Sequence, residues 1–176
     1  MPDVTLGAVG REQARGLAAR FGREEVAAVY SSPLERARET AAPIATALGQ
    51  AVRTAPDLIE IDFGEWTGLA FDDLRRDERW HVWNRDREAG GPPGGETMRA
   101  TQDRAAIAVE HFLADHPDGT VVAVSHSDVI KAVVCRQLGL SLDRYGAFEI
   151  GPASVTSLVL WPGGGKVLSL NVGAAA

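Results

Sequence analysis

Cysteine and long apolar runs are both scarce in this sequence. Cys135 is the only cysteine among 176 residues, so no disulfide can form within the chain and a reducing compartment is compatible. No apolar run reaches the roughly eighteen residues that a membrane-spanning helix needs. The start, Met1-Pro2-Asp3, has neither the basic region nor the apolar core of a secretory signal, and we therefore expect a cytoplasmic protein without membrane contact.

A net positive charge, metal-ligand spacing and the common catalytic glycine motifs are also missing. A net charge of −6 disfavours a nucleic-acid partner, which would need a basic face. His81, His111 and His116 have no spacing suited to zinc, and no cysteine or acidic residue completes a ligand set, so we expect no metal. No Gly-x-Ser-x-Gly, P-loop or dinucleotide-binding pattern is present.

The composition is globular, with alternating strand and helix patterns. With 45% hydrophobic and 24% charged residues, a chain of this length suits one domain, residues 1–176. Apolar runs and helical spacing predict strands at 26–30, 51–54 and 121–124, helices at 9–21, 33–48 and 98–113, one or two helices in 71–87, a helix after 126, and a hairpin of strands 155–160 and 166–170. This order predicts an α/β fold, a three-layer sandwich with a mostly parallel sheet, helices on both faces and the hairpin as an antiparallel edge.

His126 lies at the joint between the predicted strand 121–124 and the helix that follows it. The first turn of a helix leaves unpaired amides and the positive end of the helix dipole beside the last strand residue, and anions bind there. Ligands of parallel sheets also bind beyond the carboxyl ends of the strands. His126 therefore faces a phosphate-sized site, or it is an N-cap or a buried core histidine; this segment alone favours neither interpretation.

Arg36 falls in the first turn of the second predicted helix. Ser32 as the cap and Glu35 three residues later form a capping box that predicts where this helix begins. An arginine in the first turn leans back toward the helix N-terminus, where its guanidinium can clamp a phosphate at the same sheet edge as the histidine. The competing interpretation is a surface arginine paired with Glu35 or Glu39.

Glu60 ends an apolar pair and precedes a loop rich in glycine and aromatic residues. A carboxyl group that is half shielded in this way has a raised pKa, as a proton donor to a leaving oxygen needs. The alternative is a solvated loop carboxylate. Three other acidic residues nearby compete for the same role: Asp57, Asp62 and Glu65.

Four stretches of the chain form a recognisable pattern. They are SSPLERARETA at residues 31–41, EIDFGEWTG at 60–68, PGGET at 93–97 and VSHS at 124–127. In order and spacing they resemble the histidine phosphatase superfamily, the phosphoglycerate mutase-like enzymes, across nearly the whole chain, and they look most like a bacterial phosphomutase branch. In that family a phosphoryl group moves to a histidine and then to water or to an acceptor hydroxyl, and no metal or cofactor is implied.

The resemblance implies roles for five residues. Arg36 binds the phosphoryl oxygens, His126 stabilises charge on the transferred group, and Glu60 is the proton donor. The Ser127 amide is a further donor, and Glu96 belongs to the substrate-binding residues. We therefore expect a phosphatase, or a phosphomutase, acting on a small phosphorylated metabolite; whether it forms a homodimer is left open.

One motif of the family is missing. The family begins with a strand ending in Arg-His-Gly, whose histidine is the nucleophile, and this sequence contains no such motif. Without a nucleophile the covalent route is closed, so we expect the chain as given to be inactive. Three explanations fit the missing motif: a misplaced start codon, a fragment of a longer protein, or a relative without catalytic activity. We favour the first two. Loss of that strand also predicts unpaired strand edges in the sheet.

Overall fold

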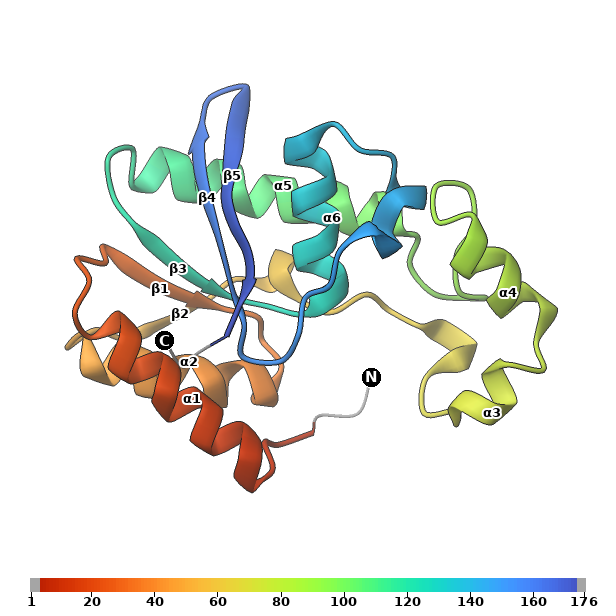
Figure 1. The fold of residues 1–176 in the computed structure, drawn as a ribbon, viewed down its shortest axis with the longest axis horizontal. Helices are drawn as coiled ribbons and strands as arrows, with labels where there is room; N and C mark the ends of the chain where they lie inside the picture. The colour runs from red at the N-terminus through yellow and green to blue at the C-terminus, as the bar shows by residue number, and fades with distance from the viewer. Residues whose placement is uncertain (1–3, 174–176) are drawn as a thin grey trace.

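The computed structural model describes residues 4–173 and contains the expected alternation of helices and strands (Figure 1). The helices are α1 (Ala8–Phe21), α2 (Glu35–Ala47), α3 (Phe71–Leu74), α4 (Glu78–Arg85), α5 (Met98–Asp115) and α6 (Ser127–Leu138). The strands are β1 (Ala28–Ser31), β2 (Val52–Thr54), β3 (Val121–Val124), β4 (Val155–Trp161) and β5 (Gly164–Val172). Short 3-10 helices lie in the connections: η1 (Pro56–Leu58), η2 (Gly64–Trp66) and η3 (Leu142–Ala147). Between residues 4 and 173, no helix has both the length and the apolar character that crossing a bilayer demands.

β1 is the centre of a parallel sheet with the strand order β2-β1-β3. All of its residues are buried because helices cover both faces. Val29 packs with Leu17 of α1 and Ile44 of α2 on one face, whereas Ala28 packs with Ala108 of α5 on the other. Figure 1 shows the resulting layers, with α1 and α2 below the sheet and α5 above it. The predicted α/β class with a covered parallel sheet is confirmed.

The C-terminal hairpin is attached differently from the prediction. β4 and β5 pair in antiparallel register, as expected. They form a separate two-stranded sheet instead of extending the parallel one, and within residues 4–173 β3 pairs with β1 alone. The hairpin is held by contacts with α6 and by Val155 against the core of α1 and α2, and Figure 1 shows it standing across the sheet. Ladder hydrogen bonds need aligned strands about 4.8 Å apart, which this crossing does not provide.

The segment from residue 64 to residue 85, here called the aromatic lobe, is fixed to the main body by α5 and α6. Its buried Trp66 and Trp83 share a core with Met98 of α5 and with Ala132 and Cys135 of α6. The rings of the two tryptophans lie 5.6 Å apart between centroids. The aromatic lobe therefore holds a firm position beside the carboxyl ends of the parallel strands.

Candidate active site

The carboxyl ends of β1 and β3 meet at one edge of the parallel sheet. Ser31 and Val124 are register partners, and the amide of Ser32 donates to the Val124 carbonyl at 2.9 Å. Two residues beyond β3, the Nε2 atom of His126 lies 2.7 Å from the Ser32 Oγ, and both side chains are buried. The pairing of two strands that are distant in sequence thus brings the histidine against the serine turn.

Ser32 has a different role from the predicted one. α2 begins at Glu35 with Leu34 as its N-cap and without a side-chain cap, so the predicted capping box is wrong. The Ser32 hydroxyl is held by His126 and lies 3.4 Å from the Leu34 amide, at the long end of hydrogen bonding. His126 itself occupies the N-cap position of α6, but its ring makes no capping bond. Its imidazole therefore contacts Ser32 and does not cap the helix.

Glu60 lies beside the other nitrogen of His126. Its Oε2 is 3.9 Å from Nδ1, and its Oε1 accepts the amide of the following residue at 3.0 Å. Burial and the negative charge of Asp128 raise the pKa of Glu60 to about 7. Burial and the positive charges of Arg36 and Arg104 lower the pKa of His126 to about 4. At neutral pH the imidazole is uncharged, so this contact is not an ion pair, and a pKa of about 7 leaves Glu60 partly protonated and able to donate a proton.

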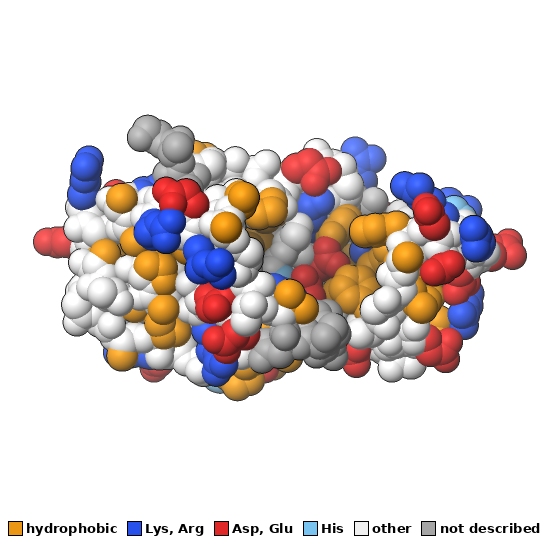
Figure 2. Space-filling model, turned by 90° about the horizontal axis from the view of Figure 1, so that it is seen from below, with side chains coloured by type: hydrophobic (Ala, Val, Ile, Leu, Met, Phe, Trp, Pro, Cys, Tyr) orange, Lys and Arg blue, Asp and Glu red, His pale blue; other side chains and the backbone are white. Residues whose placement is uncertain are grey.

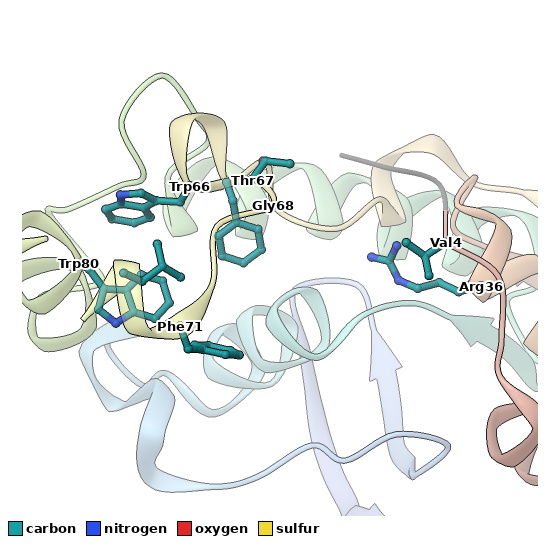
Figure 3. Close-up of a pocket in the computed structure, with 9 residues that line it drawn as sticks. Val4, Arg36, Trp66, Thr67, Gly68, Phe71 and Trp80 are labelled. Carbon is teal, nitrogen blue, oxygen red and sulfur yellow. The ribbon is translucent and has the colours of Figure 1, made fainter. Parts of the chain in front are cut away.

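Arg36, in the first turn of α2, lines a hollow that faces the aromatic lobe (Figure 3). Its positive charge lowers the pKa values of both Glu60 and His126, which puts the guanidinium within electrostatic reach of both. Glu39, an alternative partner by sequence, accepts the amide of Leu6. The structure thus brings together the three residues predicted to be catalytic.

The N-terminus of α6 adds backbone donors to the same edge. The Ile130 amide donates to the His126 carbonyl at 2.9 Å, and the helical amides before it have no acceptor within α6. The hydroxyl of Ser127 donates to the Ile150 carbonyl at 3.2 Å. The hydroxyl of Ser127 is thus already used, and an anion contact through its amide stays a prediction.

Glu96 reaches the site through Arg104. Its two carboxylate oxygens accept from this guanidinium at 2.7 and 2.9 Å, and the third nitrogen donates to the Asp57 carbonyl at 2.7 Å. The charge of Arg104 acts on Glu60 and His126. Sequence reasoning missed Arg104 because nothing in its helical pattern distinguishes it from a solvated arginine. Direct contact of Glu96 with substrate stays a prediction.

The loops of the second and third sequence motifs pack backbone against backbone. A Cβ on Gly95 would lie 2.3 Å from the Asp62 carbonyl oxygen, and one on Gly64 would lie 2.3 Å from that of Pro93. The Glu96 amide donates to the Asp62 carbonyl at 2.8 Å. Only glycine allows this approach, which joins the segments carrying the two glutamates of the site.

Asp128 and Tyr145 form a contact beside the site that the sequence did not indicate. The Tyr145 hydroxyl donates to the Asp128 carboxylate, across 17 residues of sequence. Burial and this carboxylate raise the pKa of Tyr145, and the same carboxylate raises that of Glu60. The contact between α6 and η3 is what brings the two side chains together.

The remaining sequence candidates lie elsewhere. Glu65 is exposed beside Arg79, His81 contacts a backbone carbonyl at 2.7 Å, and His116 contacts the Tyr30 hydroxyl at 3.1 Å. In the part of the chain that the structure describes, no group of three or more His, Cys, Asp or Glu side chains is arranged to hold a metal ion.

The chain is similar in sequence to known proteins. Phosphoserine phosphatase 1 of Hydrogenobacter thermophilus is 31% identical over 172 residues, which cover 97% of this chain and 82% of that protein. A bifunctional protein of Mycobacterium tuberculosis is 39% identical over 132 residues, which cover 74% of this chain and 34% of that protein. The chain thus spans only about a third of the second relative.

The fold is shared as well. A mycobacterial glucosyl-3-phosphoglycerate phosphatase solved in complex with VO3 superposes with a TM-score of 0.87 at 28% identity, over 97% of this chain and 88% of that one. The relatives support a phosphatase-type activity. The family model for the histidine phosphatase superfamily (branch 1) matches residues 1–173, a span that includes Arg36, Glu60 and His126. By this match and by its fold, the chain belongs to the histidine phosphatase superfamily.

Proposed function

We propose that this protein hydrolyses small phosphomonoesters through a phosphohistidine intermediate. The observation that carries the proposal is the 3.9 Å approach of Glu60 to His126, with the charge of Arg36 acting on both. A cation, a neutral imidazole and a carboxyl group with a pKa of about 7 thereby meet at a helix N-terminus. Phosphoryl transfer depends on such positioning, on neutralisation of spread negative charge and on protonation of the leaving oxygen.

Two balanced steps follow from these roles. First, the ester P–O bond breaks while a P–N bond forms to the nucleophilic histidine, and Glu60 gives its proton to the departing alcohol oxygen. Water then attacks phosphorus, the P–N bond breaks, phosphate leaves, and ionised Glu60 takes back a proton. Arg36, His126 and the Ser127 amide hold the phosphoryl oxygens in both steps. We place the nucleophile on an Arg-His-Gly segment outside these 176 residues, which contain no such motif.

Calorimetry with inorganic phosphate tests the binding half of this proposal. We expect the 176-residue chain to bind phosphate and Arg36→Gln to weaken binding at least about tenfold, since it removes a bidentate cation. Arg136→Gln changes an arginine in the last turn of α6 that pairs with Asp103 on the surface; it is the matched control and should bind as the wild type does. Absence of phosphate binding by the wild type would contradict the proposal.

The chemical half is tested on a longer chain. The DNA upstream of the Met1 codon should encode, in frame, an apolar strand followed by Arg-His-Gly, and the longer protein should hydrolyse phosphomonoesters. Glu60→Gln should lower kcat about 100-fold for an alkyl phosphate, and far less for p-nitrophenyl phosphate, whose leaving oxygen needs little protonation. Equal losses on both esters, or a loss of only a few-fold on the alkyl ester, would count against Glu60 as the donor.

A second candidate is a phosphate-binding relative without turnover. The observation that favours it is the missing Arg-His-Gly motif. Upstream DNA that lacks the motif, together with phosphate binding by the chain, would select this candidate over the phosphatase.

A further inference from the structure

Arg36 lines one side of a hollow, and the aromatic lobe forms the opposite side. Its volume is about 420 Å³, in the range of small-molecule sites. Figure 3 shows Arg36 and Val4 on one side, with the guanidinium directed across the hollow, and Trp66, Phe71 and Trp80 on the other. Figure 2 shows hydrophobic side chains along the wall of this hollow. A phosphate held by Arg36 therefore has an aromatic surface opposite it.

The aromatic wall has a defined geometry. The rings of Trp66 and Trp80 meet edge to face, 5.3 Å apart at 80°, and Phe71 meets Trp80 at 6.5 Å and 68°. The indole N–H of Trp66 donates to Asp77 at 3.0 Å. That donor is already used inside the aromatic lobe, so Trp66 presents apolar surface to the hollow.

Polar groups are few in the rest of the lining. Among the described residues that line the hollow, Arg36 is the only charged one, and the side chain of Thr67 is the only hydroxyl. A substrate whose organic part carries an ammonium, a carboxylate or several hydroxyls would lose hydration there without gaining matching hydrogen bonds. The lining therefore disfavours a polar organic group.

Phe71 adds an apolar surface that the described chain leaves mostly exposed. Its side chain is 71% exposed, the second highest exposure among the large hydrophobic residues of residues 4–173. A contiguous exposed apolar patch can mark a ligand-binding groove, whereas a single exposed side chain does not. Phe71 counts because it lines the hollow together with Trp66 and Trp80. A ligand ring seated on Phe71 would remove this surface from water.

We infer that the substrate carries an aromatic or similarly apolar group on its phosphoester oxygen, seated against Phe71 and Trp80 while Arg36 holds the phosphate. The inference rests on the proposed function and narrows its substrate class. It differs from the substrates in the names of two relatives reported above, phosphoserine and glucosyl-3-phosphoglycerate, whose organic parts are polar.

Calorimetry with two phosphonates that cannot be hydrolysed tests the inference on the 176-residue chain. Naphthylmethylphosphonate should bind at least about tenfold more tightly than methylphosphonate, because only the former reaches the aromatic wall. Phe71→Ser should weaken the naphthyl ligand about fivefold and leave methylphosphonate unchanged. Leu168→Ser removes another exposed large hydrophobic side chain, 59% exposed and outside the lining, and should change neither affinity.

The outcomes separate this inference from the proposed function. Equal affinities for the two phosphonates, or a Phe71→Ser variant that weakens both equally, would overturn the apolar substrate class and leave the phosphate site standing. Failure of methylphosphonate to bind at all would overturn the proposed function, and this inference with it. If Phe71→Ser keeps the wild-type melting temperature, its measured affinities report on binding and not on unfolding. If this variant melts at a lower temperature, Phe71→Leu takes its place, with a smaller expected loss of affinity for the naphthyl ligand.

Discussion

Glu60→Gln should stabilise this protein above neutral pH. In the folded chain the pKa of Glu60 is raised from 4.5 to about 7, with burial as the main cause. The folded state therefore keeps a proton that the unfolded chain has already lost. The stability contributed by protonated Glu60 is fully present below pH 4.5 and is lost as the pH rises through about 7.

The size of the effect follows from the shift. The pKa of Glu60 in the folded chain, about 7, lies about 2.5 above its ordinary value of 4.5. Each pKa unit corresponds to about 1.4 kcal/mol, so protonated Glu60 contributes about 3 kcal/mol to the free energy of unfolding. Glutamine carries no charge, has the same length and retains an oxygen for the amide that Glu60 accepts at 3.0 Å. The variant should match the wild type near pH 4.5 and exceed its stability by about 3 kcal/mol near pH 8.

His126 contributes in the opposite direction. Its pKa falls from 6.5 to about 4 on folding, so its stability contribution is present above pH 6.5 and is lost as the pH falls through about 4. In the wild type the two contributions offset each other between about pH 4.5 and 6.5. Glu60→Gln removes one of them, so the variant should gain stability as the pH rises through this window.

Urea unfolding followed by tryptophan fluorescence, from pH 4.5 to about 8.5, measures both curves. Glu25→Gln changes an exposed glutamate before β1 and should shift stability by less than about 0.5 kcal/mol at every pH. A difference between Glu60→Gln and wild type that does not grow with pH would refute the argument that burial raises the pKa of Glu60.

Other predictions test the surroundings of this carboxyl group. Phosphate binding should raise the pKa of His126, because an adjacent anion favours the imidazolium, and an unchanged value in an NMR titration would contradict contact between the two. Ser32→Ala removes the 2.7 Å contact with His126 and should cost about 1–2 kcal/mol in urea unfolding and weaken phosphate binding in calorimetry; a stability loss with unchanged affinity would limit the serine to a folding role. Gly95→Ala should cost about 3 kcal/mol, since its Cβ would lie 2.3 Å from a backbone oxygen, whereas Gly146→Ala has nothing within 4 Å and is the control; equal losses would contradict the close loop contact.

The sequence by itself determined the order of the elements and the family. Apolar periodicity, glycine turns and short motifs act within windows of a few residues, and the helices and strands form close to the positions that these signals predict. It also singled out Arg36 and His126 as candidates, because ligands bind at the carboxyl ends of parallel strands. It singled out Glu60 because an apolar pair and a loop rich in glycine and aromatic residues flank it.

Only the tertiary structure decided how those residues are partnered and charged. Ser32 and His126 are 94 residues apart, and a local capping signal at Ser32 was overruled when two strands paired and gave the hydroxyl a buried partner. The pKa of Glu60 depends on burial and on Asp128, neither of which its neighbours in sequence reveal. The aromatic wall across from Arg36 likewise exists because the aromatic lobe packs on α6, a contact between distant parts of the chain that no local pattern encodes.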